Sequence, residues 1–329
     1  HLGDYFYEYG PGTYPGTEQA QPGRVLFPAH EIVTLADYRT RYATYRRDAD
    51  LRRLHQLYPM IAGWDDHEST NDSWEGGAQN HQRESEGEWS VRKAAAIKAY
   101  REWMPVSDEP WAAYEVGDLA TLYRLETRLT ARSQQLDVAK VLTGKSTADE
   151  MMAALKAFHD GAWADPARQM MGAAQEAWLA DGLKASTRAG TRWQVLVQQV
   201  LMGNLNTPAG LADALPKSMP DALRQRLVAG SMASAAGIPF NMDAWDGYPV
   251  EREQVLMQLK SIGKPVIALA GDTHNAWHNK LTLKDGTEVG VELATPGVTS
   301  PGMEHYLSMG DEKAKTLADD LPLLIEDLQ

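Results

Sequence analysis

One short apolar run constrains the fold of this chain more than any other feature of its sequence. Residues Val266–Ala270 are five consecutive apolar positions without polar alternation, and the run ends at Gly271. Such a run predicts a strand that is buried on both faces. Another strand candidate, Trp193–Val197, is apolar except at Gln194 and lies upstream, and a helical pattern from Pro249 to Gly263 separates the two. Strands that alternate with helices favour an α/β fold over an all-α or all-β one.

The rest of the sequence repeats this alternation. We expect helices at residues 33–58 and 175–183, one capped by Ser90 that ends before Pro105, and one after the capping box at Thr147. Strands are expected at residues 58–64 and 122–129, and a hairpin at 280–294 with Asp285-Gly286 at its turn. Residues 10–30 are rich in Pro and Gly and predict a loop. No linker divides the chain, so residues 1–329 are expected to form a single domain.

Composition excludes several classes of protein. The 329 residues include 45 Asp and Glu against 32 Lys and Arg, a formal charge of −13, which argues against a basic surface for nucleic acid. The chain has no cysteine, which excludes disulfides, thiolate metal ligands and a cysteine nucleophile. Aliphatic stretches reach about five residues, far below the roughly 20 that a transmembrane helix needs, so no membrane span is expected.

Acidic and histidine side chains follow three apolar runs that lie far apart in the chain. They are Asp4 after His1-Leu2-Gly3, Asp65-Asp66-His67 after residues 58–64, and Asp272 with His274 after Val266–Ala270. Functional groups of α/β sheets lie just beyond the carboxyl ends of strands, so we expect the three groups to converge. Asp4 can bridge two cations through its two oxygens. The carboxylates of Asp66 and Asp272 suit calcium, manganese or iron better than copper.

Each group taken alone also has a purely structural interpretation. A Gly-Asp pair after a strand is usually a turn, and Asp65-Asp66-His67-Glu68 resembles a solvated acidic loop. Other functional motifs do not fit: the spacing of an EF-hand is not met, and there is no Gly-x-Ser-x-Gly elbow, Walker loop or dinucleotide-binding fingerprint. The three groups together, rather than any one of them, therefore indicate a metal site.

Seven short motifs, some of them named above, follow one another along the chain. They are Gly3-Asp4-Tyr5-Phe6-Tyr7-Glu8, Trp64-Asp65-Asp66-His67-Glu68, Gln175-Glu176-Ala177-Trp178-Leu179, Trp193-Gln194-Val195-Leu196, Trp245-Asp246-Gly247-Tyr248, Gly271-Asp272-Thr273-His274-Asn275 and Ser300-Pro301-Gly302. In order and spacing this set resembles the PhoD-type alkaline phosphatase/phosphodiesterase family of the calcineurin-like metallophosphoesterases. The resemblance implies an α/β fold: a layered metallophosphoesterase-type β-sandwich flanked by helices, with residues 1–329 as its catalytic domain.

The resemblance also implies a role for each site residue. The implied metal ligands are Asp4, Tyr7, Asp66, Asp272 and His274. His67 is the implied catalytic group, a general acid or a stabiliser of the transition state. Weaker candidates, as further ligands or as supports of the ligands, are Asp65, Gln199 and Asn71. Two alternatives stay open: Tyr7 could be a packed aromatic, and His67 could only orient Asp65 or Asp66. Arg128 is given no catalytic role.

The beginning of the chain bears on the number of ligands. It opens at His1 without an initiator Met or a signal peptide. Two cations need nearly a dozen contacts, roughly six each, which is more than the five implied ligands supply. The resemblance implies a further ligand on a strand upstream of Gly3-Asp4. We therefore expect the first strand or strands of the fold to be missing from the N-terminus.

The activity that the resemblance implies is metal-dependent hydrolysis of phosphate monoesters, diesters or both, by attack of a metal-bound hydroxide. It implies ferric iron and calcium as cofactors, with manganese and zinc as other candidates, and a location in the periplasm or outside the cell. Small phosphate esters are the expected partners, and the oligomeric state is not predicted. The alternative is a catalytically silent calcium-binding or structural module, or a truncated and inactive phosphoesterase, which the expected missing strand and the glutamine at position 199 favour.

Overall fold

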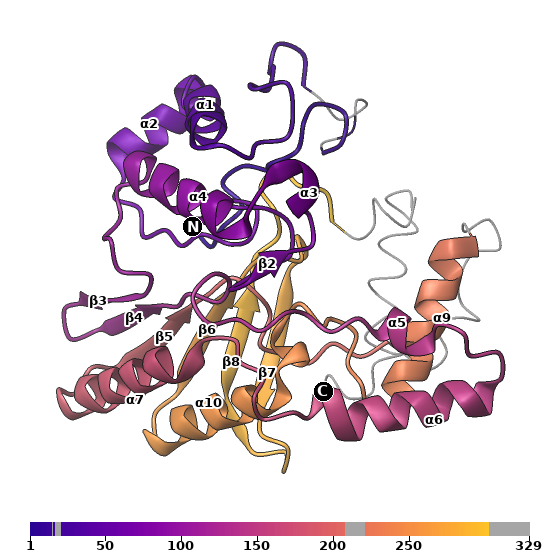
Figure 1. The fold of residues 1–329 in the computed structure, drawn as a ribbon. Helices are drawn as coiled ribbons and strands as arrows, with labels where there is room; N and C mark the ends of the chain where they lie inside the picture. Colours follow the sequence, from indigo (N-terminus) through magenta and orange to yellow (C-terminus); the bar gives the residue numbers. More distant parts are fainter. Residues whose placement is uncertain (15, 17–20, 208–220, 303–329) are drawn as a thin grey trace, which may run out of the picture.

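The computed structural model describes residues 1–14, 16, 21–207 and 221–302 (Figure 1). Its centre is a six-stranded sheet in the order β3-β4-β5-β6-β8-β7. These strands are β3 (Ala112–Val116), β4 (Ala120–Arg124), β5 (Trp193–Val197), β6 (Val266–Ala270), β7 (Trp277–Thr282) and β8 (Glu288–Ala294). The four inner strands run parallel, whereas β3 and β7 at the edges are antiparallel to their neighbours. The predicted α/β class is confirmed.

Two helices cover one face of this sheet. Helices α7 (Gly172–Arg188) and α10 (Pro249–Ser261) lie side by side along it (Figure 1). Their buried leucines, among them Leu179, Leu183 and Leu256, join one apolar core with Leu196 of β5 and Ala268 of β6. Burial of this apolar surface is the main favourable contribution to folding here. In β6, Val266, Ala268 and Ala270 are buried whereas Ile267 and Leu269 are only partly buried, so the expected burial on both faces is complete on one face only.

The N-terminal part forms a second, aromatic core at the carboxyl ends of the parallel strands. Helices α1 (Leu35–Tyr45), α2 (Ala49–Leu57) and α4 (Trp89–Trp103) gather there, at the top of Figure 1. Phe6 is fully buried against α1, where its ring lies edge-on to Tyr42 with the centroids 4.6 Å apart. This packing fixes the segment that carries Asp4 and Tyr7.

The remaining elements lie beside these two cores. A satellite apolar cluster joins α5 (Val138–Leu142), α6 (Ala148–Phe158) and α9 (Asp221–Ala235). The others are α3 (Arg83–Glu86), the two-stranded hairpin of β1 (Ser73–Trp74) and β2 (Gly77–Ala78), the π-helical turn η1 (His159–Trp163) and the 3-10 turn η2 (Trp245–Gly247).

Several expected elements are confirmed with their local causes. Thr147 caps α6 through a capping box, in which its hydroxyl accepts the backbone N–H of Glu150 at 3.2 Å. Pro249 is the first residue of α10, where its missing N–H costs nothing. The hairpin of β7 and β8 forms, with Gly286 in its turn at φ 80°.

Two helix predictions need correction. The expected helix at residues 33–58 is two helices, because Asp48 starts a new one by accepting the N–H of Leu51 at 2.9 Å. The helix expected to be capped by Ser90 begins two residues earlier than that cap implies, at Trp89, with Glu88 in the cap position and no side-chain cap.

One strand prediction is also wrong, and another is correct only for its first residues. Residues 58–64 are extended but belong to no strand, and they bond instead to the first residue: Gly63 donates to the carbonyl of His1 at 3.1 Å. The strand expected at residues 122–129 ends at Arg124. Beyond it, the Glu126 carboxylate accepts hydrogen bonds from the N–H groups of Arg128 and Leu129, and these bonds stabilise a turn in place of the strand.

The described residues contain this large sheet and the short β1–β2 hairpin, but no second large sheet packed against it. The layered sandwich therefore stays a prediction. No helix within the described ranges is both long and apolar enough to cross a membrane.

Candidate metal centre

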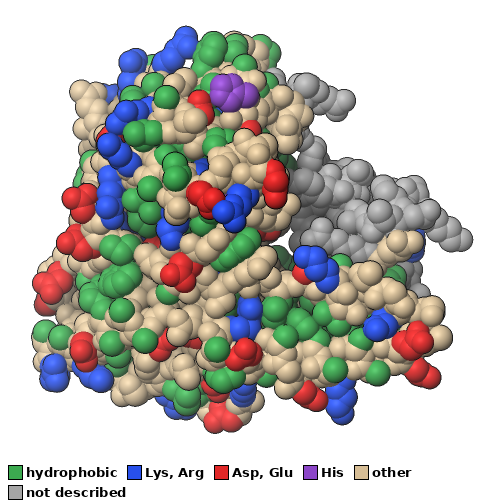
Figure 2. Space-filling view, viewed as in Figure 1, with side chains coloured by type: hydrophobic (Ala, Val, Ile, Leu, Met, Phe, Trp, Pro, Cys, Tyr) green, Lys and Arg blue, Asp and Glu red, His purple; other side chains and the backbone are tan. Residues whose placement is uncertain are grey.

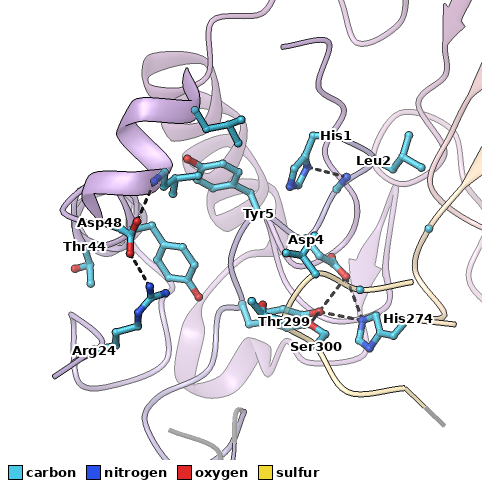
Figure 3. A pocket seen from close by; sticks show the side chains of 18 of the residues that line it. His1, Leu2, Asp4, Tyr5, Arg24, Thr44, Asp48, His274, Thr299 and Ser300 are labelled. Carbon is cyan, nitrogen blue, oxygen red and sulfur yellow. Dashed lines mark hydrogen bonds and ion pairs between the residues drawn. The ribbon is translucent and has the colours of Figure 1, made fainter. Parts of the chain in front are cut away.

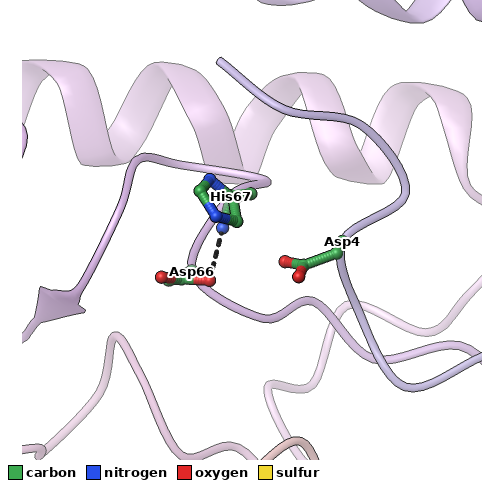
Figure 4. A group of neighbouring side chains, drawn as sticks. All are labelled: Asp4, Asp66 and His67. Atoms are coloured by element: carbon green, nitrogen blue, oxygen red, sulfur yellow. Dashed lines mark hydrogen bonds between the residues drawn. The ribbon is translucent and has the colours of Figure 1, made fainter. Parts of the chain in front are cut away.

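The three groups of acidic and histidine residues meet at one place. Ligand atoms of Asp4, Asp66 and His67 all lie within 4.8 Å of one another, and so do those of Asp65, Asp66 and Asp272. Figure 4 shows the Asp4 carboxylate directed from the N-terminal segment toward Asp66 and His67. Asp66 belongs to both groups. The structure therefore brings together acidic side chains that could hold a metal ion, while their individual roles stay predictions.

Unusual backbone conformations concentrate at this place. In the described part of the chain, four residues other than glycine have a positive φ: Asp4 (56°), Asp72 (48°), Asp272 (66°) and His274 (60°). A non-glycine residue in this region is strained by roughly 1–3 kcal/mol. Three of the four are predicted ligands, and the fourth donates its N–H to Asp66 at 2.7 Å. Such strain is typical of functional sites, where it gives side chains an orientation that a relaxed backbone would not allow.

Gly3 allows the first two segments to approach each other. Its φ is +121°, and a Cβ atom on it would lie 2.2 Å from the Cβ of Asp65. The Glu68 carboxylate then ties the segments together by accepting the N–H groups of Asp4 at 3.1 Å and Asp65 at 2.8 Å. Burial, together with the charge of Asp4, raises the pKa of Glu68 to about 8. Glu68 belongs to one of the motifs given above, but its role in joining the segments was not predicted.

Asp66 is held ionised at the centre of the site. Burial alone would raise its pKa, but Arg128 and His67 outweigh that effect and keep the pKa of Asp66 below its ordinary range. Its two oxygens accept the N–H groups of His67 at 2.9 Å and Asp72 at 2.7 Å. These bonds fix the carboxylate in the orientation that both ligand groups share.

His67 is oriented by a buried glutamate that sequence reasoning missed. Its Nδ1 lies 2.6 Å from Glu8 Oε2, and the Glu8 side chain has no exposed surface. Glu8 is itself held by the hydroxyl of Thr70 at 2.9 Å and the N–H of Asn71 at 2.8 Å. Burial would lower the pKa of His67, but Asp66, Glu8 and Asp4 raise it well above its ordinary value. The surrounding carboxylates therefore favour the protonated form of His67, which can donate a proton.

Tyr7 faces the site and not the aromatic core. Its hydroxyl lies 2.8 Å from Ser300 Oγ, 3.0 Å from His274 Nε2 and 3.3 Å from Asp4 Oδ2. Burial, together with the charge of Asp4, raises the pKa of Tyr7 far above its usual value. The phenol is thus neutral unless a strong Lewis acid replaces its proton.

Arg128 is the largest omission of the sequence analysis. Its guanidinium, which has no exposed surface, contacts Asp65, donates to both oxygens of Asp243 at 2.8 and 2.9 Å, and reaches Asp272 at 2.9 Å. A single cation thus holds together carboxylates from three distant segments. Asp243, which Arg132 also contacts, was missed as well.

The site carries more carboxylates than its own cations balance. Burial and the charges of Asp243, Asp66 and Asp4 raise the pKa of Asp272 to about 8, even though Arg128 opposes them. Asp4 Oδ1 is buried and has no hydrogen-bond partner among the described residues. The carboxylate oxygens are hard donors that repel one another, and one of them lacks a hydrogen bond. Such a set of donors fits a divalent or trivalent cation.

Two weaker candidates have contacts outside both ligand groups. The Gln199 amide accepts from the Thr127 hydroxyl at 2.6 Å and donates to the Leu125 carbonyl at 3.2 Å. The Asn71 side chain donates to Gln79 at 3.0 Å. Their contacts favour a supporting role over metal ligation. Asp65, by contrast, lies inside one ligand group.

A cavity of about 1030 Å³ opens beside the centre, and Asp4, Tyr7, Asp272 and His274 line it. Figure 3 shows Asp4, His274 and Ser300 on one side of it and Thr44 and Asp48 of the α1–α2 segment on the other. The centre is therefore reachable by a ligand of substantial size.

Comparison with known proteins decides the family. The family model described as "PhoD-like phosphatase" matches residues 1–324. The chain belongs to the PhoD-like phosphatase family. The resemblance drawn from the motifs is thereby confirmed. A PhoD-like phosphatase implies a metal cofactor, and the two ligand groups described above are able to bind one.

Two relatives of this PhoD-like chain are informative. It is 32% identical over 317 residues to alkaline phosphatase D of Bacillus subtilis (strain 168), an alignment that covers 92% of this chain and 46% of that protein. A solved structure described as "Structure of PhoD" matches with a TM-score of 0.65 and 30% identity, covering 91% of this chain and 51% of that one. The chain spans about half the length of these relatives.

Proposed function

We propose that this PhoD-like chain hydrolyses phosphate esters, monoesters or diesters, at a centre of two cations. The observation that carries the proposal is the convergence of carboxylates on Asp66, which lies close to Asp4 in one group and to Asp65 and Asp272 in the other. His67, which also lies in the first group, is assigned to proton transfer and not to metal binding. Asp4 completes the first group and Asp272 the second, while Tyr7 and His274 extend the donor set around Asp4. Bound cations supply positive charge that stabilises the phosphoryl oxygens and lowers the pKa of a coordinated water.

The chain's own residues provide the remaining chemistry. His67 donates a proton to the oxygen of the departing alcohol, which gains negative charge as its bond to phosphorus breaks. Glu8 holds the imidazole by Nδ1, so the ring meets the substrate through Nε2. Asp65 and Asp272 keep their orientation through Arg128.

The identity of the metals is a finer part of the proposal. We favour ferric iron near Tyr7 and calcium among the carboxylates, with manganese or zinc as the other candidates. Support for iron comes from the position of the Tyr7 hydroxyl, 3.3 Å from Asp4 Oδ2 and 3.0 Å from His274 Nε2, because a phenolate is a ligand that suits a strong Lewis acid. Elemental analysis tests this directly. A visible absorption band that Tyr7→Phe removes would support ferric iron, and a colourless, iron-free active enzyme would exclude it.

We also propose that the natural substrates are small phosphate esters met in the periplasm or outside the cell. Support for the location is the resemblance to the PhoD family alone. Fractionation of cells that express the full-length protein, followed by immunoblotting, tests the location. Recovery of the protein in the cytoplasmic fraction would overturn it.

Turnover tests the activity. We expect p-nitrophenyl phosphate, bis(p-nitrophenyl) phosphate or both to be hydrolysed, and chelation to abolish the reaction until metals are restored. Asp66→Asn should remove at least two orders of magnitude of kcat, since it weakens both ligand groups. Asp50→Asn, on the exposed side of α2, is the matched control and should leave the rate unchanged. Tight metal binding without turnover of either ester would overturn the proposal in favour of a silent metal-binding module.

A further inference from the structure

The cavity beside the metal centre extends much farther than a phosphate group requires. Its volume is about 1030 Å³, at the upper end of the range typical of small-molecule sites, roughly 300–1,000 Å³. One end is formed by Asp4, Tyr7, Asp272 and His274, and the other reaches the α1–α2 segment. In Figure 3 the labelled residues of the two ends face each other across this space. Whatever part of an ester lies beyond its phosphate must occupy the far end.

The far end is predominantly apolar. Its lining includes Leu26, Phe27, Leu51, Leu54 and Met60. Of these, Phe27 and Leu54 each keep 44% of their surface exposed, so the described chain covers them only in part. Large apolar side chains left exposed around one cavity mark a binding site more often than chance exposure.

The charged residues at the far end leave it predominantly apolar. Arg24 and Asp48 line it together and neutralise each other in an ion pair of 2.8 Å. Arg47, which is exposed, adds a positive charge on the same wall. Figure 2 shows Lys and Arg side chains gathered on the surface over α1, α2 and α4, although the chain as a whole has a charge of −13. The wall of the far end therefore favours an apolar group.

We infer that the far end of this cavity binds the organic group of the ester, and that this group is an apolar chain of several carbons. The inference rests on the proposed function, because the phosphate is taken to lie at Asp4 and Asp272. The apolar chain then contacts Leu54 and Phe27, which lose their exposed surface to it. The preferred substrates are thus esters of apolar alcohols rather than of sugars or other highly polar alcohols.

Straight-chain alkylphosphonates test this without depending on turnover. Their dissociation constants are measured by titration calorimetry on the metal-loaded protein, from methylphosphonate to octylphosphonate. Full burial of a methylene is worth up to about fourfold in affinity, and partial burial about twofold. We expect the dissociation constant to fall by a factor in this range for each added methylene. A constant that does not change with chain length would overturn the inference.

A matched pair of variants locates the effect. Leu54 and Leu57 lie on the same helix with similar exposure, 44% and 48%, but only Leu54 lines the cavity. Leu54→Asp should reduce the ratio of octylphosphonate to methylphosphonate affinity about tenfold, because a carboxylate would meet the chain. Leu57→Asp should leave the ratio unchanged. An equal loss of this ratio in both variants would overturn the inference. It would also be overturned if the wild-type protein were oligomeric and only Leu54→Asp made it monomeric, because a second copy of the chain would then occupy the far end.

The same experiment separates this inference from the proposed function. Chain-length-dependent binding in a protein that hydrolyses neither p-nitrophenyl ester would sustain the apolar site and refute the phosphoesterase. Turnover with a flat chain-length profile would sustain the phosphoesterase and refute the apolar site.

Discussion

Glu8 and His67 form a buried pair in which Oε2 of the glutamate lies 2.6 Å from Nδ1 of the histidine. Neither residue is exposed by more than 9%. The pair determines which ring nitrogen faces the metal centre and, with Asp66, keeps the pKa of His67 well above its ordinary value. A histidine held in this way is available as an acid at a pH where a free imidazole would be largely neutral.

Replacing Glu8 by glutamine should therefore alter the pH dependence as well as the rate. In Glu8→Gln the ring keeps a hydrogen-bond partner but loses a negative charge, so the pKa of His67 falls. We expect kcat to drop by about 10- to 100-fold, as is usual when the partner of a functional histidine is lost. The alkaline limb of the profile of kcat against pH should move to lower pH, because the protonated form is lost earlier.

Glu31→Gln is the control for this variant. Glu31 contacts Asn80 at 3.1 Å, as Glu8 does at 3.0 Å, but it has no contact with His67. Its replacement should leave both limbs of the pH profile in place. A Glu8→Gln enzyme that is slower by the same factor at every pH would show that Glu8 serves the fold alone.

The second prediction concerns Arg128 and the free energy of unfolding. Arg128→Met leaves Asp65, Asp243 and Asp272 without their shared cation, and breaking a buried ion pair from one side costs about 3–5 kcal/mol. Added calcium or manganese should restore part of the loss, since a bound cation supplies the missing charge. Urea unfolding with and without the metal measures both effects.

A surface arginine provides the comparison. Arg39→Met breaks an exposed ion pair with Glu102 and should change the unfolding curve little, with or without metal. If cations stabilise wild type and Arg128→Met equally, Arg128 does not compensate for the charge of the metal centre.

The convergence of the site was predictable, although for a partly wrong reason. We expected each acidic group to follow a strand, but only Asp272 does, after β6. Asp4 and Asp66 are placed instead by hydrogen bonds between loops, through Glu68 and the close approach at Gly3. Hydrogen bonds between segments about 60 residues apart leave no periodic signal in a sequence.

Arg128 and Asp243 could not be predicted by the same reasoning. Sequence priors place arginine at the surface, and only the folded arrangement of carboxylates makes its burial favourable. The same limit applies to the edge strand β3, whose residues are half exposed and show no uninterrupted apolar run. Strands β5 and β6 were predictable because most of their residues are apolar, with residues 195–197 buried in β5 and every second residue buried in β6.

Gly3 makes the third prediction. Gly3→Ala places a Cβ 2.2 Å from that of Asp65 in a backbone region that side chains avoid, so the two segments must separate. We expect a loss of about 3 kcal/mol or more in unfolding free energy and less metal bound per chain. Gly87→Ala shares the positive φ, +85°, but its new Cβ meets nothing within 4 Å. That variant should cost about 1–3 kcal/mol from backbone strain alone and retain its metal. Full metal loading in Gly3→Ala would refute the proposed approach of the segments.

Asp246 makes the last prediction, on stability against pH away from the metal centre. One of its oxygens accepts the N–H of Leu205 at 2.9 Å, while Oδ1 is buried without a partner in the described part of the chain. Burial raises the pKa of Asp246 to about 7, so the folded state holds this proton more tightly than the unfolded state. The contribution of Asp246 to stability therefore falls as the pH rises from about 4 to about 7.

Asp246→Asn cannot ionise and keeps an oxygen for Leu205. Its stability relative to wild type should rise across that pH window and level off above it, by about 2–4 kcal/mol in total. Asp285→Asn, at an exposed turn where a hydrogen bond from Thr287 lowers the pKa of the aspartate, should show no such gain. Urea unfolding at pH 5 and pH 8 measures the difference. An Asp246→Asn protein whose advantage is the same at both values would show that Asp246 is not protonated in the folded state, and that Arg252 and the backbone satisfy its charge.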